Sequence, residues 1–358
     1  NCNPEDNPSL RPECGNDGYC GQTLTPNNGE LGMRNITVYI PSKYSNDELG
    51  VMVMQDGELG PFFSNFVNVL DNLIDSEDED RSLPAFALVA IEVAGSPGIF
   101  SGGECADGPG SERYNEYQTV SAEYAEFVSK EVLPFVTAHP NIKKQYPNLK
   151  FTNDPAGRAA FGSSSAGAAA FKMAFFSPDL FGISIGYSPA IVNLTMHGGN
   201  LTSDSKYPLR MGEMYIRKPE GQELINSETK KNIRIFHSAG ENDVGTPNAC
   251  EPDGSPSITP DGYPSILEAH EQVEKDLVAK GYETRYAYAQ KGCHVQPDVM
   301  LQDLPNTLVW AWADWKKKVD QTKANPQTLE EQPSSSVRPR FSGAISIVSA
   351  VVIFYYVY

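Results

Sequence analysis

The sequence predicts an α/β protein whose core is a mostly parallel, doubly wound sheet flanked by helices. Two observations support this prediction. From residue 31 to residue 319, short apolar runs alternate with longer segments of helical periodicity, a pattern typical of parallel sheets with helices on both faces. In addition, one apolar run ends in a Gly- and Ser-rich turn, residues 162–167, that opens directly into a helix of small residues.

The expected elements follow one another along this region. The expected strands cover residues 35–40, 50–54, 85–93, 158–161, 182–187, 233–238 and 284–289. The expected helices cover residues 61–74, 117–138, 168–176, 265–280 and 304–319. The 61–74 helix carries Phe62, Phe66 and Leu70 on one face, as a helix packed on a sheet does. Residues 188–230 show no clear pattern, and the loop 94–110 is long enough to be functional.

The turn at 162–167 has the layout of a nucleophile elbow, in which a serine lies on a sharp strand-to-helix turn with its hydroxyl exposed. Small residues allow the strained turn and the close approach of helix and strand. Ser164 takes the central position between Ser163 and Ser165, and Ala166 replaces the last glycine of G-x-S-x-G. The alternative is a Ser/Gly-rich loop that merely caps an ordinary helix.

A serine nucleophile needs a base and an orienting acid, which lie just past the carboxyl ends of strands in an open α/β sheet. His294 directly follows the last expected strand and is the preferred base. Asp243 follows the 233–238 strand and is the preferred acid, with Glu241 of the same loop as runner-up. The order Ser164, Asp243, His294 is the one found in α/β-hydrolases. The remaining histidines are His139 at a helix end, His197, which stays open as a base, and His237 and His270, which are expected to be packed or solvated.

Two cysteines lie next to these candidates. Cys293 precedes His294, and Cys250 lies just beyond the acid loop, so both are expected near the same edge of the sheet. We therefore expect a Cys250–Cys293 disulfide that braces the two loops. No Cys-x-x-Cys or His-x-x-x-His spacing predicts a metal site.

The composition favours a secreted protein. The 358 residues carry a formal net charge of -18, which argues against binding to nucleic acid or anionic lipid. Sequons begin at Asn35, Asn193 and Asn200, and the cysteine count of 6 is even. Residues 1–30 hold three cysteines and are expected to form an extension stapled by disulfides. The start at Asn1 rather than Met is consistent with a removed leader.

The C-terminal residues predict attachment to a membrane. Residues 320–343 are polar and Pro/Ser-rich, as in a disordered linker, and residues 344–358 form an uncharged apolar run. This run is shorter than the 20 or so residues that span a bilayer. The nearest basic residues precede it and none follows, which is the wrong polarity for a type I span. Small residues, a polar spacer and an apolar tail instead match a GPI-attachment signal. A short transmembrane anchor is the alternative.

The chain resembles the enterochelin esterase-like branch of the α/β-hydrolases, also called the esterase D-like group, over about residues 31–318. The resemblance rests on segments spread along the chain, among them residues 34–41, 54–57, 130–134, 162–167, 177–181, 238–243, 280–282 and 292–294, together with Arg113 and Glu116. It implies the α/β-hydrolase fold, a serine esterase that needs no cofactor, and a small-molecule or polysaccharide ester as substrate. Siderophore trilactones, feruloylated or acetylated polysaccharides and polyesters all fit.

The resemblance also assigns residues. Several members carry the Gly-Ser-Ser-Ser elbow with the middle serine as nucleophile, which favours Ser164. The oxyanion donors would be the Ser165 amide and an amide after the 50–54 strand, with Gly57 preferred over Glu58. Arg113 would bind substrate, or alternatively form an ion pair with Glu116.

A second function from another class fits the same fold. A catalytically inactive surface protein could use a hydrolase fold for binding or adhesion. The Cys-rich, anchored context and Ala166 in the elbow favour this alternative.

Overall fold

The structure is a computed structural model of the whole chain. It describes residues 22–24, 34–41, 48–57, 61–94, 113–118, 121–191, 224–247, 249–250, 265–324 and 352–357. The Cys-rich extension apart from residues 22–24, nearly all of the 94–110 loop, and the sequon residues Asn193 and Asn200 lie outside these ranges.

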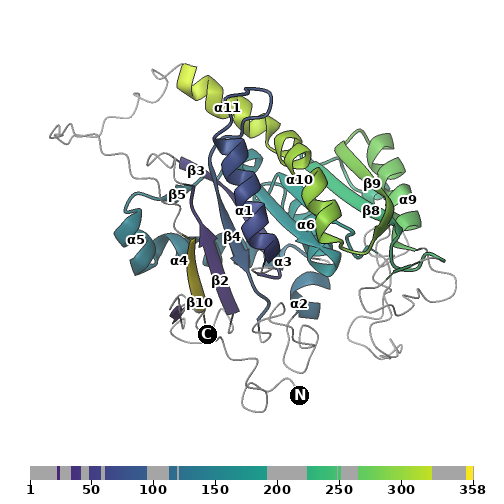
Figure 1. Cartoon of the computed structure of the whole chain (residues 1–358), viewed down its shortest axis with the longest axis horizontal. Coiled ribbons are helices and arrows are strands. Elements are labelled where there is room, and N and C mark those ends of the chain that lie inside the picture. The colour runs from purple at the N-terminus through teal and green to yellow at the C-terminus, as the bar shows by residue number, and fades with distance from the viewer. Residues whose placement is uncertain are drawn as a thin grey trace, which may run out of the picture.

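One mixed sheet forms the centre of the described chain (Figure 1). Its strand order is β1-β10-β2-β4-β3-β6-β7-β8-β9, and β5 pairs with β3 at one end. The strands from β4 to β9 run parallel, and β2 is antiparallel to β4. The bounds are β1 Gln22–Leu24, β2 Arg34–Tyr39, β3 Glu48–Gln55, β4 Phe86–Ile91, β5 Lys150–Phe151, β6 Arg158–Ser163, β7 Ile183–Tyr187, β8 Arg234–Asn242, β9 Glu283–Cys293 and β10 Val352–Val357. The predicted α/β fold with a mostly parallel sheet is confirmed.

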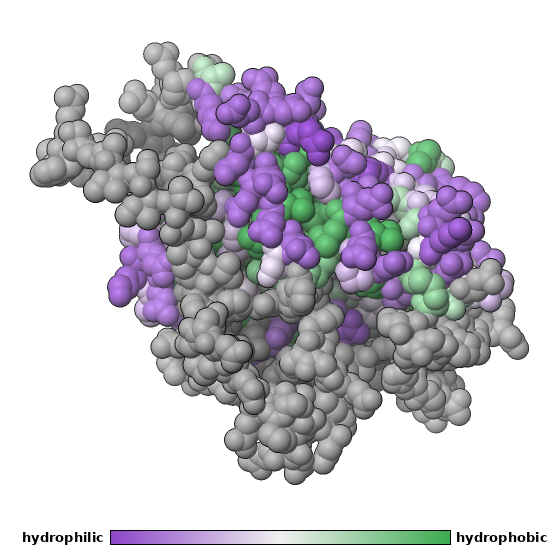
Figure 2. All heavy atoms as spheres, viewed as in Figure 1, coloured by the Kyte–Doolittle hydropathy of each residue, from purple (hydrophilic) through white to green (hydrophobic). Residues whose placement is uncertain are grey.

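Helices cover both faces of the sheet, and each face has its own hydrophobic core. One core packs α1, α10 and α11 on the sheet, and the other packs α3, α4, α6 and α9. Figure 2 shows hydrophilic side chains on the outer surfaces of α1 and α11, with hydrophobic side chains visible where α1 meets α10. The bounds are α1 Pro61–Ile74, α2 Arg113–Gln118, α3 Glu123–Phe127, α4 Leu133–Ala138, α5 Pro140–Gln145, α6 Ser164–Phe176, α8 Leu224–Ser227, α9 Ile266–Ala279, α10 Pro297–Ala311 and α11 Ala313–Ala324.

Two predicted helices differ from the structure. The single helix expected over 117–138 is divided into α2, α3 and α4, with a π-helical turn at Val128–Val132 between the last two. The helix expected over 304–319 is divided into α10, which begins at Pro297 and contains Pro305, and α11, which begins at Ala313. The buried side chains of Met300, Leu304 and Leu308 form a stripe at a spacing of four residues. Packing of this stripe on the sheet keeps the chain helical on both sides of the proline.

The C-terminal segments also differ in part. Residues 320–324, expected in the linker, belong to α11. Residues 352–357 of the apolar tail form β10, which is antiparallel to β2 and parallel to β1. No helix within the described ranges is long and apolar enough to cross a membrane. Membrane attachment through the tail stays a prediction.

Candidate active site

The turn between β6 and α6 is as tight as the sequence predicts. Ser164, the first residue of α6, has a φ of 52°, in the left-handed region that side chains other than glycine rarely adopt. A Cβ on Gly162 would lie 2.3 Å from the carbonyl carbon and oxygen of Ala166. Glycine at 162 is therefore required by the close approach of helix and strand. Ala166 itself is fully buried in the first turn of the helix, so its methyl group is accommodated.

The structure brings the three predicted side chains together from three loops at the carboxyl ends of β6, β8 and β9. His294 Nε2 lies 3.0 Å from Ser164 Oγ, and His294 Nδ1 lies 2.7 Å from Asp243 Oδ1. A carboxylate can only accept, so Nδ1 carries the proton and Nε2 is left to accept from the serine hydroxyl. The imidazole is thus held in the tautomer that can remove a proton from Ser164.

Asp243 is fully buried, and hydrogen bonds from the protein take the place of water around its carboxylate. Oδ1 accepts from the Val244 amide at 2.8 Å as well as from His294, and Oδ2 accepts from Ser188 Oγ at 2.7 Å and from the Gly240 amide at 3.0 Å. Burial by itself would raise the pKa of this carboxyl group, but the hydrogen bonds, above all the one from His294, outweigh burial and hold the pKa below its usual range. Asp243 therefore stays ionised next to the imidazole.

Glu241, the runner-up for the acid, has another role. Its Oε2 accepts the Lys291 amide at 2.7 Å, and the side chain is only partly buried. This contact links the ends of β8 and β9 away from the imidazole, so Asp243 rather than Glu241 faces His294.

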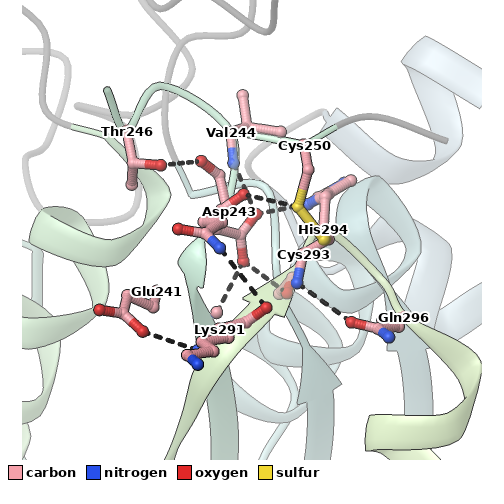
Figure 3. Close-up of a disulfide and its surroundings, with 12 residues drawn as sticks. Glu241, Asp243, Val244, Thr246, Cys250, Lys291, Cys293, His294 and Gln296 are labelled. Atoms are coloured by element: carbon pink, nitrogen blue, oxygen red, sulfur yellow. Dashed lines mark hydrogen bonds and ion pairs between the residues drawn. A yellow bond between two sulfur atoms is a disulfide. The ribbon is translucent and has the colours of Figure 1, made fainter. Parts of the chain in front are cut away.

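The expected disulfide Cys250–Cys293 is present, with a Cα–Cα distance of 5.4 Å (Figure 3). Cys293 is the Cα partner of Asn242 across β8 and β9, and the Cys250 amide donates to Asn242 O at 3.1 Å. The disulfide thus closes the loop that carries Asp243 onto the residue that precedes His294.

Of the two predicted oxyanion donors, the structure is compatible with Ser165 but not with Gly57. Ser165 is buried in the first turn of α6, where backbone N–H groups have no acceptor within the helix. The prediction of Gly57 as the second donor is wrong, because its amide donates to Ile91 O at 2.8 Å and so continues the β3–β4 pairing. Glu58, the alternative, lies outside the described residues.

The turn after β3 is held by buried polar contacts. Arg113 forms a bidentate ion pair with Asp56, with its Nη2 2.9 Å from Oδ2, and the Asp56 amide donates to Tyr117 Oη at 2.8 Å. The expected alternative, an Arg113–Glu116 pair, is replaced by an Arg34–Glu116 pair at 2.6 Å. Arg113 therefore fixes the turn after β3, and its contact with substrate stays a prediction.

The other histidines do not contact Ser164. His139 caps α5 by accepting the Asn141 amide, and His237 and His270 form a buried pair behind the site. His197 lies outside the described residues. Within the described ranges, no cluster of three or more His, Cys, Asp or Glu residues could hold a metal ion.

Sequence reasoning missed Ser188, which follows β7 with a φ of 42° and donates to Asp243. It stands at the start of the segment with no clear pattern, and nothing in its neighbours marks it. Only the approach of the β7 and β8 ends reveals the contact.

A family model described as "Putative esterase" matches residues 32–286. The chain belongs to this esterase family. Family membership supports an ester hydrolase. No curated protein matches the chain.

Solved structures similar to this chain support the α/β-hydrolase fold. The BES protein from Bacillus cereus is similar with a TM-score of 0.50 and 17% identity, covering 81% of this chain and 92% of that one. The enterobactin esterase FES from Shigella flexneri, solved in the presence of 2,3-dihydroxy-N-benzoyl-glycine, has a TM-score of 0.50 and 17% identity over 85% of this chain. This chain covers 64% of that esterase, which is less than two thirds of its length.

Proposed function

We propose that the protein is a serine esterase that hydrolyses carboxylic esters through an acyl-enzyme, with Ser164 as nucleophile, His294 as general base and Asp243 as orienting acid. The observation that supports this proposal is the continuous hydrogen-bond chain from Asp243 Oδ1 through the His294 ring to Ser164 Oγ, with lengths of 2.7 and 3.0 Å. Its residues directly follow three separate strands, β6, β8 and β9, and lie 51 and 130 residues apart in the sequence, so local structure does not explain why they meet.

In the first half of the reaction, His294 Nε2 takes the Ser164 proton as the hydroxyl oxygen attacks the ester carbonyl. Asp243 stabilises the imidazolium that forms and does not itself take up the proton. The imidazolium then donates its proton to the departing alkoxide, and the alcohol leaves. Water, deprotonated by His294, attacks the acyl group in the second half, and the acid is released from Ser164.

The developing oxyanion would be stabilised by the Ser165 amide, since this donor lies in the first turn of α6, where the positive end of the helix dipole adds to it. One such donor contributes roughly 3 kcal/mol to the transition state. A second amide is expected from the residues directly after Gly57. The Arg113–Asp56 and Tyr117–Asp56 contacts support this role by fixing the start of that loop.

The substrate class follows from charge. A net charge of -18 disfavours polyanionic substrates and favours neutral esters. The sequons, the disulfide Cys250–Cys293 and the apolar tail support an extracellular enzyme held at the cell surface, most simply through a GPI anchor.

The decisive experiment compares Ser164→Ala with the wild type on short acyl, feruloyl and trilactone esters. We expect wild-type turnover of at least one ester and a loss of roughly 10⁴-fold or more in kcat in the variant. Ser163→Ala serves as the control, because this neighbouring serine ends β6 and, among the described residues, the hydrogen bond of His294 Nε2 goes to Ser164 instead. Full turnover by Ser164→Ala would refute the assignment. A folded wild type that hydrolyses no ester would favour the inactive binding protein instead.

A further inference from the structure

A second chain of polar side chains lies directly behind the candidate triad. His237 of β8 and His270 of α9 are almost fully buried, with exposed fractions of 3% and 1%. Their Nδ1 atoms face each other at 2.9 Å. At the outer end, His237 Nε2 lies 3.0 Å from Glu274 Oε2, and at the inner end His270 Nε2 lies 2.9 Å from Pro189 O.

The inner end leads to the active site. Pro189 lies between Ser188 and Ala190 in the turn after β7. Ser188 Oγ donates to Asp243 at 2.7 Å, and the Ala190 amide donates to Ser164 O at 2.8 Å. The Pro189 carbonyl therefore belongs to a turn that holds both the nucleophile and the acid.

The three contacts of this chain need three protons. The Pro189 carbonyl only accepts, so its bond needs a proton on His270 Nε2. The Nδ1–Nδ1 contact needs one proton, and the contact with the Glu274 carboxylate needs one on His237 Nε2. Two neutral imidazoles carry only two protons, so all three bonds exist only when the pair has taken up one more.

The carboxylate decides which bond is lost when that proton leaves. Burial tends to raise the Glu274 pKa, but hydrogen bonds from His237 and Thr284 lower it below its usual range, so Glu274 stays ionised. A hydrogen bond to a charged acceptor is stronger than one to a neutral carbonyl. With two protons left, His237 Nε2–H points to Glu274 and His270 Nδ1–H to His237. His270 Nε2 then faces the Pro189 carbonyl without a proton.

We propose that His237, His270 and Glu274 form a protonation-dependent positioning relay, in which one shared extra proton keeps the Pro189 carbonyl bound to His270, in addition to its bond from the Ile191 amide, and so holds the 188–190 turn against the triad. The proposal rests on the proposed function, since the turn it holds is the one that supports Ser164 and Asp243. On deprotonation, the proton leaves to water and the turn loses its hold from His270. The histidines are positioning residues, because neither touches Ser164.

The groups facing the pair are compatible with this view. From β9, Tyr286 stacks on His237 with ring centroids 4.9 Å apart and stays neutral, because burial raises its pKa. Burial first, and His237 second, lower the pKa of His270 to about 3, while Asp243 raises it and His294 lowers it. His270 is therefore the ring of the pair that stays neutral. From β7 and α6, the residues lining the pair, such as Gly186 and Phe171, carry no charge.

The substitution Glu274→Gln should remove the dependence of the Pro189 bond on the extra proton. A glutamine amide can donate to neutral His237 Nε2, so all three bonds then form with two ring protons at any pH. We expect kcat/KM of the wild type to fall about three- to tenfold at alkaline pH as the bond between His270 and the Pro189 carbonyl is lost. In Glu274→Gln the alkaline fall should disappear. Glu271→Gln, an exposed position on the same helix with the same charge change, should keep it.

A spectroscopic measurement on the wild type tests the relay without any turnover. The ¹⁵N shifts of the His270 ring report which nitrogen carries the proton. We expect the proton to move from Nε2 to Nδ1 as the pH rises in the wild type and to stay on Nε2 in Glu274→Gln. A His270 Nε2–H that persists at all pH values in the wild type would overturn the proposal. An alkaline fall in kcat/KM of the same size in Glu274→Gln and in the wild type would also overturn the proposal. If Ser164→Ala keeps full turnover, the proposed function fails, and the ring shifts still decide the relay.

Discussion

Ser164 holds a backbone conformation that an L side chain adopts only under constraint. Its φ of 52° is accompanied by positive φ values at Asp56, Ser188, Lys291 and Val295. Asp56, Ser188 and Val295 lie in turns that follow strands, and Lys291 lies near the carboxyl end of β9, two residues before Cys293. Such conformations persist only where the surrounding structure enforces them, and each costs about 1–3 kcal/mol. Strain is thus concentrated where the chemistry is proposed.

Ser164→Gly should therefore be more stable than Ser164→Ala. Both variants lose the hydroxyl, but only glycine adopts a φ of 52° without steric conflict. We expect a higher free energy of unfolding for the glycine variant, by about 1 kcal/mol, in urea denaturation. Neither variant should hydrolyse an ester. An alanine variant as stable as the glycine variant would show that the elbow stores no strain at this residue.

Helix α6 packs against the sheet through small and apolar residues, with one exception. Lys172 is 1% exposed, its Nζ donates to the Glu116 carbonyl, and the ammonium lies 5.6 Å from the centre of the Tyr124 ring. Burial lowers its pKa to about 7, and the nearby Glu116 and Glu123 only partly offset this. A buried ammonium without an ionised partner in direct contact weakens the fold when it is charged.

Lys172→Met should therefore stabilise the protein, and more so at lower pH. An unfolded lysine keeps a pKa near 10.4, whereas the folded one is about 7, so between these values the unfolded state binds more protons. Stability of the wild type consequently rises with pH across this window, by an amount on the order of 5 kcal/mol as an upper bound. We expect the stability gain of the variant to be largest near about pH 6 and to shrink toward about pH 10. Lys130→Met, at a side chain that is 64% exposed, should show no such trend. A gain independent of pH would contradict a shifted lysine.

Over the whole molecule, the parts of the fold that follow from local pattern were predictable. The α1 helix begins and ends where its apolar stripe does, and the Ser164 elbow is marked by its glycines and serines. The positions of Asp243 and His294 follow from the rule that parallel strands present their carboxyl ends at one edge. Length, order and residue type are enough for these predictions.

Features that depend on contacts between distant segments were not predictable. The sequence allows Gly57 as an oxyanion donor, but in the structure its amide donates to the carbonyl of Ile91 in β4. The sequence prefers Asp243 to Glu241 as the acid but leaves Glu241 open, and burial and the His294 contact decide for Asp243. The break between α2 and α3 and the pairing of β10 with β2 likewise depend on tertiary packing that no periodicity reports.

The central claim is that Ser164 is activated by His294. Its most direct test is reaction of the intact protein with a fluorophosphonate, followed by mapping of the modified peptide. The account predicts a single adduct on Ser164 and a labelling rate that falls roughly 100-fold or more in His294→Ala. An adduct on Ser163 or Ser165, or labelling of the folded His294→Ala variant at the wild-type rate, would contradict it.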